Sequence, residues 1–226
     1  MKKPLDLSSG IFEPQYEQIH DIYNVIRVPA LSLQPNLMSP GFSYRIPKGS
    51  FVYLEIHFAP SGKLETEKLA LNLSGSRSGR GLTEYRLRDF AAHDFVISPR
   101  QEEVSVSTSR PVKHSMLITA IGAHMHWRGK WAQLKLRSPS GQEKIIYSGR
   151  YLFKNRERYE LDQPVFAAAG SAFLAEFQYD NSKANPAKID SDLEVHEGID
   201  AFKNEMGVFH IEYYKASKDV YGSKQK

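Results

Sequence analysis

The chain has 226 residues, of which 41% are hydrophobic and 25% charged, which is the balance of an ordinary globular protein. It contains no cysteine, so disulfides, thiolate metal ligands and a cysteine nucleophile are excluded, and any metal must be held by His, Met, Asp or Glu. The net charge of +4 is spread along the chain and interleaved with acids, so no nucleic-acid partner is expected, and no apolar run approaches the ~18 residues of a membrane span.

The first third of the chain predicts a linker, a strand pair and a boundary. Residues 1–40 have no clear period and contain several prolines, which indicates an irregular lead-in. The start has basic residues but lacks the apolar stretch of a signal peptide. Residues 50–58 are rich in aromatic and β-branched side chains and predict a strand, and the alternating residues 68–74 predict its partner. The Gly, Ser and Arg residues at 75–81 indicate a flexible linker and a domain boundary.

Short strand-like runs recur after this linker, and no long segment has the 3.6-residue period of a helix. Pro139-Ser140-Gly141 lies between two of the runs and predicts a hairpin turn. The sequence therefore predicts an all-β protein whose second part is an antiparallel β-sandwich. The runs are 94–97, 103–107, 115–126, 132–136, 144–147, 172–179 and 208–214.

His124-Met125-His126 is the most informative motif, because it ends an apolar run that predicts a buried strand. Residues i and i+2 of a strand face the same side, so both imidazoles would point one way. Two neutral imidazoles on one face can form half of a metal site. The alternative is a pair of polar residues on a solvated strand face.

Two further segments are unusual. Residues 179–186 read Tyr-Asp-Asn-Ser-Lys-Ala-Asn-Pro, and by themselves they predict only a loop of turn formers that leaves a strand. Asn204-Glu205-Met206 precedes the last apolar strand. A lone methionine in this position is usually a core residue, and Glu205 is expected to accept hydrogen bonds near the turn.

Taken in this order, the three segments resemble the copper type II, ascorbate-dependent monooxygenases, which include peptidylglycine α-hydroxylating monooxygenase and dopamine β-monooxygenase. The sequence resembles the family's bacterial relatives, which carry an H-M-H-x-R-G-K strand and a Y-D-N-S-x-x-N-P loop, more than its animal members. The resemblance runs from about Pro47 to Tyr214. It implies an antiparallel jelly-roll β-sandwich with a copper site at residues 83–226, preceded by a partial first-domain segment and linker at residues 1–82.

The same resemblance implies that His124, His126 and Met206 bind the copper that activates O₂ and so carry the catalysis. This donor set is chemically reasonable, because a thioether favours Cu(I) while imidazoles suit both Cu(I) and Cu(II). The resemblance further implies ascorbate or another one-electron donor as a cosubstrate, and a periplasmic or secreted location.

His57 resembles the third histidine of the family's second, electron-transfer copper site. The family's other two ligands form an adjacent histidine pair further upstream, whereas His20 is the only histidine before His57 and no His-His pair occurs in this chain. One copper site is therefore expected, with the second electron supplied by a partner domain or chain. His57 would be either a remnant or a ligand completed by another chain.

The substrate cannot be named from the sequence, and both a small molecule and a peptide are compatible with it. Gly122 stands where the amidating enzyme has the arginine that grips the peptide carboxylate. His210 stands where that enzyme has a tyrosine that contacts substrate, so it is a candidate for the substrate pocket; a role behind the metal ligands and a surface position are the alternatives. Arg128 either binds an anion or is a solvated charge at the strand end.

Three functions follow as hypotheses. The first is an oxidoreductase in which copper bound by the two histidines and the methionine activates O₂ to hydroxylate a C–H bond. The second is a copper-binding module without turnover, which serves storage or delivery or is degenerate. The third is a β-sandwich that binds carbohydrate or protein and uses no metal.

Overall fold

The structure is a computed structural model that describes residues 41–49, 62–66, 68, 75, 81–153 and 158–216. The strand predicted at 50–58, nearly all of the strand predicted at 68–74, and His57 lie outside the described residues. The chain divides into two compact units, Leu37–Tyr85 and a unit whose described part begins at Arg86. Within the first unit, β1 (Phe42–Tyr44) pairs in parallel with the start of β2 (Thr83–Ala91).

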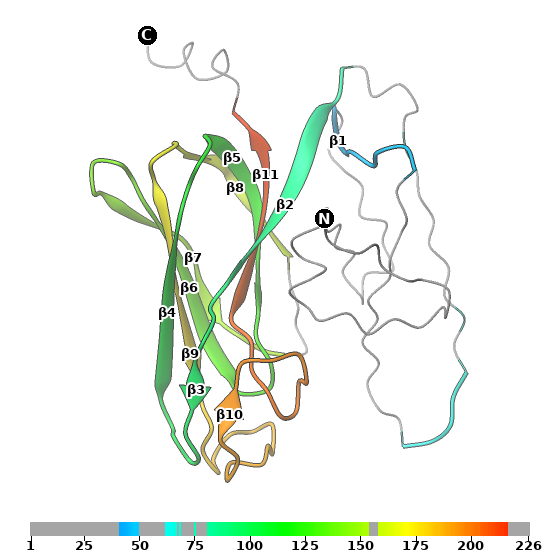
Figure 1. Cartoon of the computed structure of the whole chain (residues 1–226), viewed down its shortest axis with the longest axis vertical. Coiled ribbons are helices and arrows are strands. Elements are labelled where there is room, and N and C mark those ends of the chain that lie inside the picture. The colour runs from blue at the N-terminus through cyan, green and yellow to red at the C-terminus, as the bar shows by residue number, and fades with distance from the viewer. Residues whose placement is uncertain are drawn as a thin grey trace, which may run out of the picture. The chain divides into compact units, whose positions relative to one another are not determined.

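The described residues form strands and no helix, and hence no helix that is long and apolar enough to cross a membrane. The all-β prediction is therefore confirmed, and Figure 1 shows the strands in chain order. Every run predicted between residues 94 and 214 overlaps one of them. The strands are β1 (Phe42–Tyr44), β2 (Thr83–Ala91), β3 (Val96–Ile97), β4 (Val104–Pro111), β5 (Met116–His124), β6 (Gly129–Arg137), β7 (Glu143–Arg150), β8 (Arg158–Ala167), β9 (Ala172–Tyr179), β10 (Val195–His196) and β11 (Val208–Lys215).

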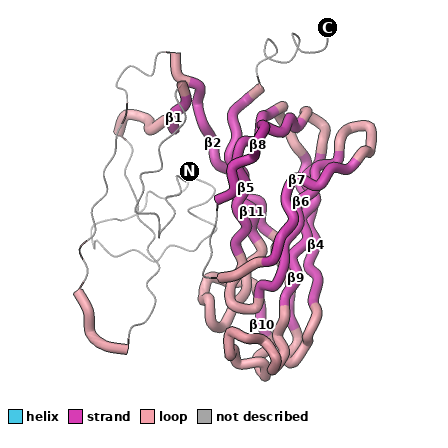
Figure 2. The backbone as a smooth tube through the Cα atoms, turned by 180° about the vertical axis from the view of Figure 1, so that it is seen from behind, coloured by secondary structure: helices cyan, strands magenta, loops and turns pink. Residues whose placement is uncertain are grey.

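The long strands form two packed sheets. One sheet has the order β1-β2-β11-β5-β8 and the other the order β4-β9-β6-β7, while β3 and β10 pair separately (Figures 1 and 2). If β1, β3 and β10 are set aside, consecutive strands lie in different sheets, except that β6 and β7 share one sheet, and β2 lies beside β11. This is the connectivity of an eight-stranded jelly roll, so the predicted antiparallel jelly-roll sandwich is confirmed.

The predicted hairpin is also present. β6 and β7 pair antiparallel around the turn at residues 138–142, where the Ser138 N–H donates to the Gln142 carbonyl at 2.8 Å. Gly141 has a φ of 89°, which only glycine adopts without strain. The Pro139-Ser140-Gly141 turn, which the sequence predicted, therefore fixes the register of these two strands.

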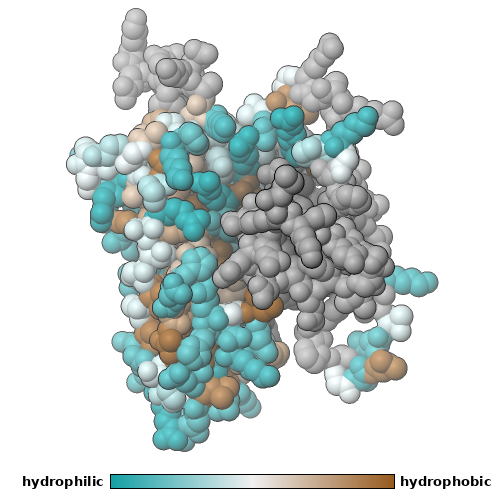
Figure 3. Space-filling model, viewed as in Figure 1, coloured by the Kyte–Doolittle hydropathy of each residue, from teal (hydrophilic) through white to brown (hydrophobic). Residues whose placement is uncertain are grey.

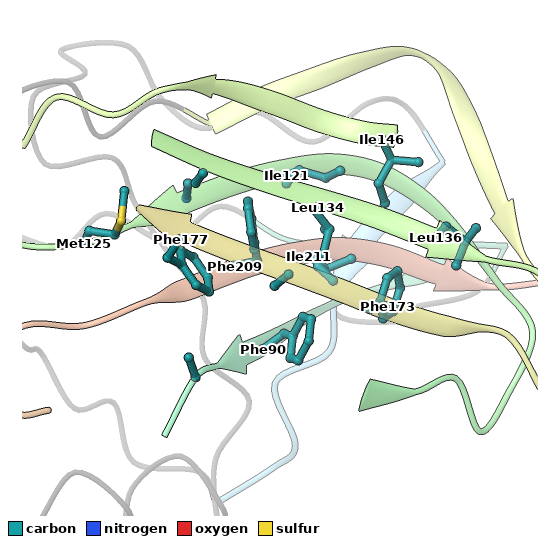
Figure 4. Close-up of a cluster of buried hydrophobic side chains, with 14 of the residues drawn as sticks. Phe90, Ile121, Met125, Leu134, Leu136, Ile146, Phe173, Phe177, Phe209 and Ile211 are labelled. Carbon is teal, nitrogen blue, oxygen red and sulfur yellow. The ribbon is translucent and has the colours of Figure 1, made fainter. Parts of the chain in front are cut away.

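The core fills the space between the inner faces of the two sheets. β9 shows the expected alternation, with every second residue buried from Phe173 to Tyr179. Figure 4 shows the aromatic and branched side chains of both sheets meeting in this space, with Met125 at one end of the cluster. Apolar burial of this kind contributes about 25 cal/mol per Å² and is the main stabilising term of such a sandwich. The residues labelled there are Phe90, Ile121, Met125, Leu134, Leu136, Ile146, Phe173, Phe177, Phe209 and Ile211.

β5 is buried on both faces. Ile121 and Ala123 belong to the core cluster, whereas Ala120 and His124 lie on the other face and are also buried. β11 has the same property, since Phe209 and Ile211 face the core while His210 and Glu212 are buried on the opposite face. The polar residues of the candidate site lie on this outer face of the five-stranded sheet.

Two strands of the sandwich, β2 and β8, were not predicted. β8 lies at the edge of its sheet and has mostly exposed or half-buried residues, so it lacks a clear apolar alternation. It also contains Pro164, which an edge strand tolerates because the missing N–H does not interrupt a ladder. The surface seen in Figure 3 is mostly hydrophilic over the described strands, with apolar patches towards the end that carries β3 and β10.

Candidate metal centre

The two histidines of the motif lie side by side at the end of β5. The strand ends at His124, two residues earlier than predicted. Met125 is fully buried in the core, and the alternation of a chain leaving a strand puts His124 and His126 on the other side. Their ring centroids are 5.3 Å apart and their planes make an angle of 80°. The structure thus brings the predicted pair together on one side of the backbone.

The His126 ring is held in one tautomer. Its Nδ1 lies 2.9 Å from the carbonyl oxygen of Asn204, and a carbonyl can only accept, so Nδ1 carries the proton. In the neutral ring Nε2 then carries the lone pair that can bind a metal. A backbone carbonyl that orients a histidine in this way is a common feature around metal sites. His126 is 1% exposed and His124 8% exposed, so both imidazoles are shielded from water.

Met206 is brought next to this pair by the register of β5 and β11. Val208 of β11 lies opposite His124 of β5. Met206 comes two residues before Val208 and His126 two residues after His124, so both lie just beyond the same end of this antiparallel strand pair. The backbone N–H groups of both residues donate to the same Glu205 carboxylate oxygen, at 3.3 Å and 2.7 Å. The Met206 carbonyl also accepts from the Tyr179 hydroxyl at 2.9 Å. The backbone of Met206, 80 residues from His126, is therefore held within a few ångströms of it by one carboxylate.

Glu205 is the buried anchor of the turn. Besides the bonds from His126 and Met206, its carboxylate accepts the Arg128 N–H at 2.6 Å, and the residue has no exposed surface. The expectation that Glu205 accepts hydrogen bonds near the turn is confirmed. Burial raises the pKa of Glu205 to about 8, while the backbone donors and the Arg128 guanidinium act in the opposite direction.

Arg128 neither binds an external anion nor lies in solvent, so both sequence interpretations of it were wrong. It is fully buried, and its guanidinium donates to the Asn181 side-chain oxygen and to the Phe202 and Asp190 carbonyls. Burial is the main cause that lowers its pKa, and nearby Glu205 acts in the opposite direction. Its role is to fasten the segment that leads to Glu205.

Asn181 extends this network and is the residue that sequence reasoning missed. Its side-chain amide donates to the Ser98 and Leu193 carbonyls, both at 3.0 Å, while its oxygen accepts from Arg128. The residue is fully buried. The loop of turn formers predicted after the strand is present, with Lys183, Ala184 and Pro186 exposed, and the brace is Asn181 alone.

His210 lies beside the histidine pair, on the same outer face of the sheet. Its partner in the β5–β11 register is Gly122, two residues before His124, and opposed residues of antiparallel strands point to the same side. The His124 and His210 ring centroids are 6.2 Å apart. The His210 Nδ1 donates to Asp89 of β2 at 2.6 Å, and both side chains are largely buried, at 8% and 15% exposed.

Aromatic side chains pack next to His126. The Phe153 ring meets His126 edge-on at 6.3 Å and packs against Trp127 at 4.3 Å, and Trp127 in turn stacks on Phe202 at 6.0 Å. Phe202 is 59% exposed. The buried indole N–H of Trp127 has no hydrogen-bond partner among the described residues.

The rings of the other described histidines have partners outside the pair or are exposed. His93 donates to Glu197 at 2.6 Å, and His114 is exposed. The exposed His196 ring pairs with Glu194, while the His196 carbonyl accepts the Glu205 N–H at 3.0 Å. In the part of the chain that the structure describes, no three His, Asp or Glu side chains are gathered to hold a metal by themselves. A metal at His124 and His126 would therefore need a further donor, for which Met206 is the candidate because its backbone is tied to that of His126 through Glu205.

The donor set fits a copper ion. Two imidazoles that share an ion at bonds of about 2 Å in a tetrahedral arrangement have ring centroids roughly 5 Å apart, close to the 5.3 Å of His124 and His126. The oriented His126 tautomer and the burial of both rings suit Cu(I), and Met206, whose backbone is tied to His126 through Glu205, would add a thioether.

No family model matches this chain, and no curated protein matches it. The family 32 CBM from C. perfringens NanJ in complex with galactose has a TM-score of 0.28 and 8% identity, over 57% of this chain and 93% of that one. The structure of the infectious bursal disease virus Gx strain has a TM-score of 0.25 and 9% identity, over 61% of this chain and 33% of that one. Infectious bursal virus-derived T=1 particles have a TM-score of 0.20 and 11% identity, over 73% and 46%. These values are too low to support an inference about function.

Proposed function

We propose that the chain binds copper through His124, His126 and Met206 and acts as a monooxygenase-like oxidoreductase. The observation that carries the proposal is the buried histidine pair, with one ring locked by the Asn204 carbonyl and with the backbone of Met206 tied to His126 through Glu205. A solvated pair of polar residues would need none of these constraints.

Each residue has a separate task in this proposal. His124 and His126 supply neutral imidazoles, and the Asn204 carbonyl keeps the proton of His126 on Nδ1. Met206 supplies the thioether, and Glu205 holds the backbones that carry both kinds of donor. Copper bound there would supply one-electron redox chemistry and a position for O₂. The burial of the rings keeps bulk water away from the donors.

The test separates copper binding from turnover. The chain is purified, loaded with Cu(I) and analysed for metal, with His124→Ala as the variant and His114→Ala, which removes an exposed histidine, as the matched control. We expect His124→Ala to lose the bound copper and His114→Ala to keep it. Equal copper in both variants would refute the site.

Ascorbate-driven O₂ consumption then tests the activity. We expect the copper-loaded chain, supplied with an electron donor, to consume O₂ faster than the same amount of free copper. Copper that binds through His124 but gives no consumption above free copper would refute the oxidoreductase and leave the copper-binding module. A chain that binds no copper would leave the metal-free β-sandwich.

A further inference from the structure

The outer face of the four-stranded sheet carries a tryptophan that the core does not use. Ala132, Leu134 and Leu136 of β6 belong to the core cluster, so Trp131 lies on the opposite face of this strand. Its side chain is half-buried, and it stacks on no aromatic ring among the described residues. Trp131 therefore adds little to the packing of the sandwich.

The strand register places polar side chains in one row with this tryptophan. Gln178 of β9 and Arg150 of β7 are the partners of Trp131 on its two sides. Ser105 of β4 lies opposite Gln178. Opposed residues of antiparallel strands point to the same side, and neighbouring strands lie about 4.8 Å apart, so the row is roughly 14 Å long. It combines an aromatic ring with an amide, a guanidinium and a hydroxyl group.

A second polar row runs beside the first, two residues further along each strand. It contains Glu176, Gln133 and Ser148. The Gln133 amide donates to the Ser148 hydroxyl and the Gln178 amide to the Glu176 carboxylate, both at 3.4 Å. The amide oxygens of both glutamines accept no hydrogen bond from a described residue, which leaves them available to a ligand.

A small hollow adjoins the Ser105 end of the first row. It has a volume of about 50 Å³, which is room for a small polar group, and its lining includes Ser105, Gln178, Glu103 and Lys130. The face is thus a shallow surface with one recess, and most of its polar side chains are half-buried or exposed.

The lysines and one of the arginines on this face are paired with acids. Lys130 pairs with Glu103 at 3.4 Å, while Lys135 and Arg137 both pair with Glu143, at 3.7 Å and 2.8 Å. The guanidinium of the first row and the carboxylate of the second have opposite signs. The face therefore lacks the excess of positive charge that binds a polyanion, and it suits a neutral polar ligand.

A neutral sugar has the chemistry that matches these groups. A pyranose ring presents C–H bonds on its faces, which pack on an aromatic ring, and hydroxyl groups around its edge. Each hydroxyl both donates and accepts, so it can bond to amide, carboxylate and guanidinium groups at once. The shallow face suits an internal stretch of an extended chain, whereas the end of a sugar chain is normally held in an enclosing pocket.

We propose that the outer face of the β4-β9-β6-β7 sheet binds a neutral polysaccharide, with Trp131 stacking on a sugar ring and Gln178, Arg150 and Glu176 bonding to its hydroxyl groups. The proposed copper centre belongs to the other sheet of the sandwich, so this binding site is separate from it. The inference does not rest on the copper site.

Affinity electrophoresis tests the proposal. Native gels contain hydroxyethyl cellulose, xylan or galactomannan, and they are run towards the cathode because the chain has a net charge of +4. We expect at least one of these polymers to retard the wild type. Trp131→Ala should weaken that binding about tenfold or more, as loss of an anchoring tryptophan does, and Trp131→Phe, which keeps a smaller ring, should weaken it less. Phe202→Ala, which removes an exposed aromatic ring outside the two rows, is the matched control and should bind as the wild type does.

Fluorescence of the wild type provides a measurement that does not depend on the folding of Trp131→Ala. The chain has two tryptophans, Trp127 and Trp131. The polymer that retards the chain should change the emission of the wild type and leave that of Trp131→Phe, in which only Trp127 emits, nearly unchanged. Urea denaturation should give Trp131→Ala a midpoint close to that of the wild type, because the side chain lies outside the core.

Several results would overturn the proposal. One is a wild type that none of the three neutral polymers retards, and another is a folded Trp131→Ala that binds as tightly as the wild type. Retardation by heparin alone would show binding of a polyanion. Dimerisation that Trp131→Ala abolishes, without polysaccharide binding, would assign the face to a second copy of the chain. Polysaccharide binding should be the same with and without copper, so a failure of the proposed copper site is a different result.

Discussion

The Glu205 carboxylate should be the most sensitive point of the turn that carries Met206, because it accepts hydrogen bonds from three backbone N–H groups inside the protein. Glu205→Ala removes both acceptor oxygens. Glu205→Gln keeps one oxygen and turns the other into an NH₂ group, which cannot accept. Glu205→Ala therefore removes the acceptors of all these hydrogen bonds, whereas Glu205→Gln removes only those on one oxygen.

The expected cost follows from the short bonds. The His126 N–H and the Arg128 N–H lie 2.7 Å and 2.6 Å from the two carboxylate oxygens, and both residues are buried. A buried donor left without a partner costs about 1–3 kcal/mol. Glu205→Ala should therefore lower the free energy of unfolding by roughly 2–6 kcal/mol, and Glu205→Gln by about half as much.

Urea denaturation at pH 7, on metal-free protein, measures both losses from the midpoint and the slope. Glu102→Gln changes an exposed glutamate and should shift the free energy of unfolding by less than about 0.5 kcal/mol. Hydrogen exchange gives an independent readout, because the amides of His126 and Arg128 should lose protection in Glu205→Ala. A loss below about 1 kcal/mol in Glu205→Ala would refute the assigned role.

Three further results are expected. Gly207→Ala should cost about 1–3 kcal/mol by overpacking, because its Cβ would lie 2.6 Å from the Tyr179 hydroxyl and 2.8 Å from the Phe177 ring, and an unchanged urea midpoint would contradict this. Arg128→Lys should lower the free energy of unfolding by roughly 3 kcal/mol, because lysine cannot reach the three acceptors, and wild-type stability would argue against the brace. For Glu205, the folded state holds its proton to about pH 8 while the unfolded state releases it near pH 4.5. The part of the stability that comes from this retained proton is therefore complete below about pH 4.5 and is lost as the pH rises to 8, whereas the backbone N–H groups keep their acceptor. The stability difference between the wild type and Glu205→Gln should change across this window, and a constant difference would contradict the raised pKa.

The strands of the sandwich could be predicted wherever one face of the strand is more buried and the other is more exposed to solvent. β9 alternates between half-buried and buried positions, and β4 alternates between exposed and half-buried positions, so periodicity located both strands. β2 was not predicted because charged residues such as Arg86 and Asp89 interrupt its apolar alternation. β8 was not predicted because it lies at the edge of its sheet and lacks a clear apolar face. The jelly-roll connectivity came from the family resemblance, and local patterns alone would not have supplied it.

The candidate site was predictable only in part. The spacing of His124 and His126 requires no more than local geometry, and their juxtaposition follows from it. Arg128 was misread because arginine is almost never fully buried, and the carbonyls that receive it lie more than 60 residues away in the chain. The contact of His210 with Asp89 depends on β11 lying beside β2, which residue types alone do not reveal.

X-ray absorption of the Cu(I)-loaded chain, compared with Met206→Ile, tests the central claim most directly. The proposed site predicts two imidazole nitrogens and one sulfur bound to the copper, with the sulfur lost in Met206→Ile and the bound copper lost in His124→Ala. A copper spectrum without sulfur, or one that both substitutions leave unchanged, would contradict the proposal that His124, His126 and Met206 form a copper centre.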